Sequence, residues 1–131
     1  MIGNFAAASS AGQGLATDFV YEDITLKHQV SITEHIGALI ASELQAAQDS
    51  SDMMLRKTAI AFAACRRPPR EVTVNFSGGL TQLCWSVARG DGDYRLVYMP
   101  KAGYFSLCVE SDFGPLDIGV HGSALGCFGS V

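Results

Sequence analysis

Cysteine and histidine are the residues of this chain best suited to chemistry, because thiolates bind zinc and attack carbonyl groups or disulfides. The sequence contains four cysteines, Cys65, Cys84, Cys108 and Cys127, and three histidines, His28, His35 and His121. No two cysteines have the C-x-x-C spacing, and no histidine stands at zinc-knuckle spacing from a cysteine. We therefore predict no metal site, and we expect reduced thiols with structural roles.

His121 and Cys127 form the one histidine and cysteine pair with a suggestive spacing. Across a tight turn such a spacing places an imidazole near a thiol and lowers the thiol pKa. If His121 and Gly122 form that turn, however, Cys127 lies opposite Leu116 and the two side chains are separated. We interpret His121 as a turn residue and Cys127 as a core residue, and we predict no catalytic residue.

Carboxylates and glycines give no cofactor signature. Asp91 and Asp93 have the spacing that begins a calcium loop, but the glycine is misplaced and no glutamate closes the loop. Turn chemistry explains these aspartates better, and the same holds for the pair Asp112 and Asp117. The glycines of residues 77–79 and 119–129 form neither a P-loop nor a dinucleotide fingerprint. No cofactor is predicted.

The tract Arg66-Arg67-Pro68-Pro69-Arg70 has two interpretations. It could be a polyproline ligand for an aromatic groove. Alternatively, the arginines favour the negative end of a helix dipole, the prolines end the helix, and a strand follows directly. The second interpretation uses every residue of the tract, so we favour it.

Composition bounds the classes of function. The chain has 131 residues, of which 48% are hydrophobic, and it carries a net charge of −4. One hydrophobic core is expected for a chain of this length. Basic residues do not outnumber acidic ones, which argues against nucleic acid as a partner. The apolar stretch Ala59 to Cys65 is far shorter than the roughly 20 residues of a membrane span. Residues 1–16 lack the basic start of a secretory signal, so we expect a cytoplasmic protein that does not bind membranes.

Hydrophobic periodicity predicts two helices ahead of a sheet. Residues 1–16 are rich in Ala, Ser and Gly and are expected to form a flexible arm, whereas residues 17–131 are expected to form a single α+β domain. Asp18 to Leu26 alternates weakly and predicts a short edge strand. Ile32 to Gln48 carries one apolar helical stripe, and Asp52 to Arg66 begins with capping residues and predicts a second helix.

The remainder has period two, with turn signals about every ten residues, as in a five- to six-stranded antiparallel β-meander. Turns at Gly78-Gly79, Asp91-Gly92 and Ala102-Gly103 define a register that agrees on one buried face. That register pairs Val74 with Leu83, Val72 with Trp85, Trp85 with Tyr98, Val87 with Leu96, Tyr98 with Leu107, and Leu96 with Val109. Two further strands are predicted, about Leu116 to Val120 and Ser123 to Phe128.

The same register leaves a weakly charged reverse face with one complementary pair, Arg95 opposite Glu110, at its margin. Because two helices can cover only one side of such a sheet, we predict that this face contacts a protein partner or a second copy of the chain. The predicted contact residues are Cys84, Ser86, Arg95, Val97, Met99, Ser106, Cys108 and Glu110. We expect a non-enzymatic protein-interaction domain, such as an inhibitor, an immunity or adaptor protein, or a small subunit of an assembly. The alternative is a small enzyme or ligand-binding domain with a pocket between helices and sheet, using Cys84, Cys127, His121 or His35.

Overall fold

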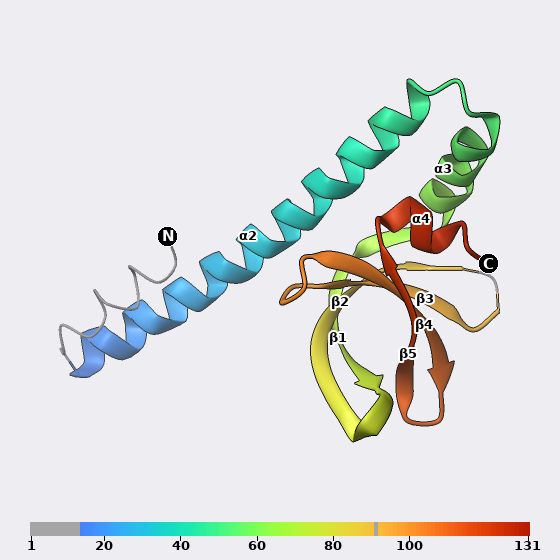
Figure 1. Cartoon of the computed structure of the whole chain (residues 1–131). Helices are drawn as coiled ribbons and strands as arrows, with labels where there is room; N and C mark the ends of the chain where they lie inside the picture. The colour runs from blue at the N-terminus through green and yellow to red at the C-terminus, as the bar shows by residue number, and fades with distance from the viewer. Residues whose placement is uncertain (1–13, 91) are drawn as a thin grey trace. The chain divides into compact units, whose positions relative to one another are not determined.

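The computed structural model describes residues 14–90 and 92–131, with the side chains of residues 31–90 and 92–131 (Figure 1). Residues 1–13 of the predicted arm therefore lie outside the described residues. The chain divides into two units whose boundary falls between Ala38 and Leu39, inside the first helix. The elements are α2 (Gly14–Gln48), α3 (Met53–Cys65), β1 (Arg66–Phe76), a 3₁₀ turn (Ser77–Gly79), β2 (Leu80–Arg89), β3 (Tyr94–Met99), β4 (Tyr104–Ser111), β5 (Gly114–Gly122) and α4 (Ala124–Phe128).

The predicted α+β class is confirmed, with two helices followed by five strands, but the sheet is not an open antiparallel meander. The five strands close into a small barrel in the order β1-β2-β3-β4-β5, and β1 pairs with β5 in parallel (Figure 1). No helix among the described residues is long and apolar enough to cross a membrane.

The prediction of an edge strand at Asp18 to Leu26 is wrong, because these residues belong to α2. The sequence from Leu15 to Ile36 contains neither glycine nor proline, so nothing interrupts a helix once it has formed. The predicted end of the first helix at Gln48 is confirmed, but its predicted start at Ile32 is wrong, because α2 already begins at Gly14.

The prediction of α3 is confirmed to within one residue at each end. The Asp52 side chain accepts hydrogen bonds from the backbone N–H groups of Met54 (3.0 Å) and Leu55 (3.3 Å), which are among the free donors of the first turn. Arg66 already has extended dihedral angles (φ −65°, ψ 141°), and β1 begins there without a linker.

The register of the hairpins is only partly as predicted. Trp85 does pair with Tyr98, but a bulge then places Ala88, not Val87, opposite Leu96. Between β1 and β2 the prediction is wrong by one residue, since Thr73 faces Leu83. The turn there has three residues, Ser77–Gly79, with positive φ at both Gly78 (85°) and Gly79 (78°), whereas the prediction assumed a two-residue turn.

Between β3 and β4 the prediction is wrong by two residues, since Leu96 faces Leu107 and Tyr98 faces Phe105. The loop has four residues, and the Gly103 backbone N–H donates to the Met99 carbonyl oxygen (2.8 Å). A shift by two residues keeps the faces, because side chains alternate with period two. Leu96 and Leu107 are accordingly buried as expected, but Leu83, also predicted to be buried, is 52% exposed.

Closure of the barrel turns the predicted outer face of β2, β3 and β4 into a buried core. Val74, Cys84, Val97, Met99 and Cys108 form one buried cluster, and the half-buried Val72 and Phe76 pack against it. The other side of the sheet is covered in part by helices: α3 contacts β2, and α4 contacts β3, β4 and β5. Both sides of the central strands are therefore buried.

The predicted strand Ser123 to Phe128 is wrong, because Ala124–Phe128 forms helix α4, and the predicted turn His121-Gly122 belongs to β5. The Glu43 carboxylate in α2 accepts hydrogen bonds from the backbone N–H groups of Ala124 and Leu125, both at 2.9 Å. Ser123 Oγ accepts from the Gly126 N–H (3.0 Å), so the short helix is capped twice. The Phe128 ring meets Phe62 of α3 edge to face, with centroids 5.4 Å apart.

The seam between β1 and β5 depends on Asn75. Asn75 pairs with Leu116, and its Nδ2 donates hydrogen bonds to the carbonyl oxygens of Phe113 (2.9 Å) and Pro115 (3.2 Å). The two N–H groups of this one amide thus link β1 and β5, the first and last strands along the chain.

We expect Asn75→Ala to lower the free energy of unfolding by about 1–3 kcal/mol, since both carbonyls lose their donor. Asn75→Asp should cost more, because a carboxylate has no donor and would face two carbonyl oxygens. Urea unfolding measures both, with Thr73→Ala, at an exposed position of the same strand, as the control. A loss below half a kcal/mol for both Asn75 variants would contradict this role for the amide.

Candidate functional site

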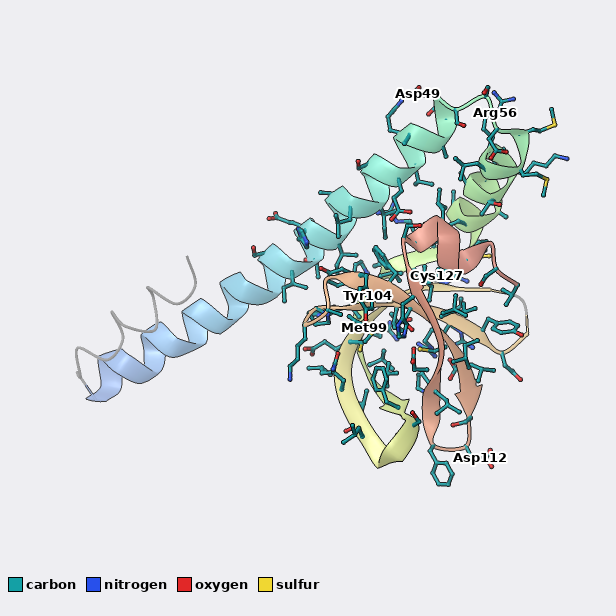
Figure 2. The ribbon with its side chains drawn as sticks, in the orientation of Figure 1. Asp49, Arg56, Met99, Tyr104, Asp112 and Cys127 are labelled. Atoms are coloured by element: carbon teal, nitrogen blue, oxygen red, sulfur yellow. The ribbon has the colours of Figure 1, made fainter. Side chains whose placement is uncertain are left out.

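The predicted contact face lies on the inner wall of the barrel. Cys84, Val97, Ser106 and Cys108 are completely shielded from solvent, and Ser86 and Met99 are each 6% exposed. Figure 2 shows Met99 among the strands of the barrel. In an open sheet this face would be exposed to solvent, whereas the closed barrel buries it. A partner cannot reach these six side chains while the barrel is closed.

Arg95 and Glu110 form the predicted charge pair, although they are not opposite each other. Arg95 faces Cys108 in the ladder, and its long side chain reaches diagonally to Glu110, with Nε 2.5 Å from Oε2. Its NH1 also donates to Ser86 Oγ at 3.0 Å. The two charged side chains are 17% and 24% exposed, so the pair has limited access to water.

A second polar group, which sequence reasoning missed, joins Ser106, Asp117 and His121. The Ser106 hydroxyl donates to Asp117 Oδ1, and His121 Nε2 lies 3.1 Å and 3.2 Å from the two oxygens of the same carboxylate. The His121 ring stacks on Tyr104, with centroids 5.2 Å apart and planes 22° apart. In β5, His121 faces Ser106 and Asp117 faces Cys108, so the ladder brings them together. The sequence could have predicted this group only through the correct register of β4 and β5. The predicted turn at His121-Gly122 is misplaced and therefore separates these residues.

The arrangement of this group does not activate a nucleophile. A serine nucleophile transfers its proton to an imidazole that a carboxylate orients from the other side. Here the carboxylate stands between hydroxyl and imidazole, and Ser106 is fully buried. The group therefore serves to satisfy polar atoms in the barrel wall.

The buried thiols are held in their protonated form. Burial, together with the negative charge of Asp117, raises the pKa of Cys84 from 9.0 to about 11. Burial and the same carboxylate raise the pKa of Cys108 to about 12. Burial, then Glu43 and Asp117, raise the pKa of Cys127 to about 11. All four cysteines are free, and thiolate chemistry at neutral pH is suppressed at these three.

Among the residues of the alternative enzyme site that lie in the second unit, no described contact joins Cys84, Cys127 and His121. Cys84 lies in the barrel core, whereas the Cys127 thiol on α4 donates to the carbonyl oxygens of Phe105 (3.5 Å) and Val120 (3.4 Å). His35 belongs to the first unit. A cavity of about 440 Å³ does lie between helices and sheet, but of the four cysteines only Cys65 lines it, beside apolar groups that include Leu96, Leu107 and Phe128.

Large apolar side chains are exposed both on the barrel, among them Leu80 (68%) and Phe113 (88%), and on the helical hairpin of the second unit, formed by residues 39–48 of α2 together with α3. Met53, Met54 and Ile60 of α3 are 60%, 69% and 72% exposed, and Phe62 is the one fully buried residue of that helix. A groove of about 330 Å³, the hairpin groove, runs between the two helices. It is lined by Leu44, Gln48, Arg56, Ala59, Ile60 and Ala63.

Comparison with protein-family models, with curated protein sequences and with solved structures finds no significant match to this chain.

We expect Val97→Asp and Met99→Asp each to destabilise the fold by about 3 kcal/mol or more, because each would bury an unpaired carboxylate in the barrel. Leu83→Asp, at a position predicted from the sequence to be buried but exposed in the structure, should change the free energy of unfolding by about half a kcal/mol or less. Urea titration followed by circular dichroism distinguishes the cases. Native stability in the Val97 and Met99 variants would show that the barrel interior is open.

The raised thiol pKa values predict a loss of stability in alkali. Between pH 9 and about 11 the unfolded chain releases its thiol protons while the folded chain retains them, so the free energy of unfolding falls as the pH rises. Below pH 9 the thiols are protonated in both states and contribute no slope. We expect a Cys84→Ala, Cys108→Ala double variant to show a shallower decline over this window in urea titrations at successive pH values. An identical slope would contradict the assigned shifts.

Proposed function

We propose that this chain is a non-enzymatic protein-interaction domain and that its contact surface is the hairpin groove with the exposed side chains of Met53, Met54 and Ile60. The single observation that carries the proposal is the exposure of these three large apolar residues on one 13-residue helix. Ile60 borders the groove, whereas Met53 and Met54 lie at the N-terminal end of α3. Exposed apolar patches of this kind commonly mark protein contacts.

Burial of these side chains supplies the driving force. Removing a Met or Ile side chain from water contributes about 1.5–3 kcal/mol when the burial is complete. Methionine adds adaptability, because its unbranched thioether fills an irregular surface. The small residues Ala59 and Ala63 form part of the groove and leave room for an incoming side chain.

The occupant we propose is the same surface of a second copy. A twofold interface must be complementary to itself, so it needs both a groove and a projecting apolar residue, and both signs of charge. Ile60 both projects and borders the groove. Exposed Asp49 and Arg56 lie at the same end of the hairpin, near the turn (Figure 2). A twofold pairing in which the turn ends of the two hairpins meet would set Asp49 of one copy near Arg56 of the other.

Ile60→Glu tests this surface without weakening the helix. Glutamate is a good helix former, and at position 60 it stands four residues after Arg56 and three after Lys57, which favours pairing along α3. We expect the wild type to dimerise. The dissociation constant of the variant dimer should be higher by about thirtyfold or more, as for loss of an interface anchor. Sedimentation equilibrium gives both dissociation constants.

Leu80→Glu is the matched control, since Leu80 is 68% exposed on β2, away from the hairpin. It should dimerise like the wild type. A wild type that stays monomeric at high micromolar concentration, or an Ile60→Glu variant that dimerises like the control, would overturn the proposal.

A further inference from the structure

The arginines of this acidic chain are concentrated at one place in the fold. Acidic residues outnumber basic ones by 13 to 9. Nevertheless five of the six arginines lie in the first half of β1, at the end of β2 and at the start of β3, three strand segments that are neighbours in the sheet: Arg66, Arg67, Arg70, Arg89 and Arg95. Only Arg56 is elsewhere.

Two irregularities of the sheet meet at the same place. The β1 to β2 ladder is interrupted between Arg66 and Arg70, across Pro68 and Pro69, which have no N–H group to donate. The β2 to β3 ladder is interrupted between Ser86 and Ala88. Bulges are concentrated at barrel rims and beside binding sites, where they redirect side chains.

The second bulge changes the direction of Arg89. Without it, alternation along β2 from Cys84 and Ser86 would turn Arg89 to the outer face of the barrel. With it, Arg89 pairs directly with Arg95, and residues that pair directly share a face. Arg95 shares a strand face with Val97 and Met99 of the core, because residues two apart in a strand point to the same side. Both guanidinium groups therefore belong to the inner side, at the mouth of the barrel. Arg70, opposite Ser86, lies on this side too.

These groups surround a cavity of about 500 Å³, which we call the arginine cavity. It is lined by Arg67, Pro68, Pro69, Arg70, Ser86, Arg89 and Arg95. Arg95 is balanced by Glu110. Among the residues whose contacts are described, no carboxylate lies within ion-pairing distance of Arg70 or Arg89. Arg89 and Arg95 stand directly opposite each other, although like charges in such pairs repel. Among the described side chains, the cavity therefore holds an excess of positive charge that no carboxylate neutralises.

We propose that the arginine cavity binds the phosphate groups of a small-molecule anion. Guanidinium groups match phosphate oxygens in bidentate geometry, and several of them converging from different strands suit a group with three acceptor oxygens and up to two charges. A single carboxylate has one charge and two oxygens, which leaves most of these donors unused. The volume lies within the range of small-molecule sites, and concavity favours a compact ligand over an extended polymer.

Titration calorimetry with pyrophosphate tests the site. We expect binding to the wild type that weakens with added salt, and a dissociation constant raised about tenfold or more in Arg70→Gln and in Arg89→Gln, because each variant removes a charge-assisted hydrogen-bond donor. Lys101→Gln is the matched control, since it makes the same change of charge at an exposed position in the loop between β3 and β4 and should bind like the wild type. Citrate should bind more weakly than pyrophosphate.

The ligand-free proteins provide a second measurement that a merely structural arginine would not reproduce. Removing the charge of Arg89 relieves its repulsion with Arg95, so Arg89→Gln should keep or raise the melting temperature at low salt while losing pyrophosphate. A lowered melting temperature would show instead that Arg89 is structural and would overturn its assignment as a ligand.

Three other results would also overturn the proposal. They are no binding of pyrophosphate at millimolar concentration, equal affinity in Arg70→Gln, Arg89→Gln and Lys101→Gln, and citrate binding as tight as pyrophosphate. Tighter binding of a short RNA through the same arginines would replace the small-molecule ligand by a nucleic acid. None of these outcomes depends on the hairpin groove, so this test and that of dimerisation fail separately.

Discussion

Closure of the sheet between β1 and β5 is the constraint on which the rest of the structure depends. The parallel contact at Asn75 and Leu116, with the Asn75 amide bridging to two carbonyls before and within β5, converts an antiparallel ribbon into a barrel. A barrel has no open edge between its first and last strands, which removes a site of aggregation. It also gives the sheet an interior, while α3 and α4 cover part of its other side.

The interior of the barrel contains polar groups as well as apolar ones, and hydrogen bonds between the polar groups explain how they are tolerated. The buried cluster is formed by Val74, Val97, Met99 and two thiols, and the hydroxyl, carboxylate and guanidinium groups beside it bond one another. A thiol tolerates such a core because its proton stays in place and its sulfur packs as a small apolar group. The carboxylate of Asp117 increases this tendency, since a second negative charge beside it would be costly.

The surfaces that closure leaves free are the ones to which the two proposals assign function. The hairpin is attached to the barrel through a narrow set of contacts, including Glu43 with the start of α4 and Phe62 with Phe128, and the outer side of α3 stays exposed. The arginine cavity arises where two bulges relax the sheet on either side of β2. Interaction through helices and anion binding at the barrel mouth therefore occupy different parts of one unit, with no side chain in common.

The sequence by itself determined features whose physical causes are local. Asp52 begins α3 and the tract after Cys65 ends it, because capping and proline act over a few residues, and the Trp85 to Tyr98 pairing and the Arg95 to Glu110 attraction follow from a short connection. Tertiary structure alone decided the β1 to β5 seam and the helical state of residues 124–128, which rests on Glu43, 81 residues earlier. It also decided which sheet face is the interior, and with it the burial of the predicted contact residues. A turn of three residues rather than two shifted one ladder, and neither that length nor a partner so distant has a signature in the local pattern, since period two is the same for an open sheet and a closed barrel.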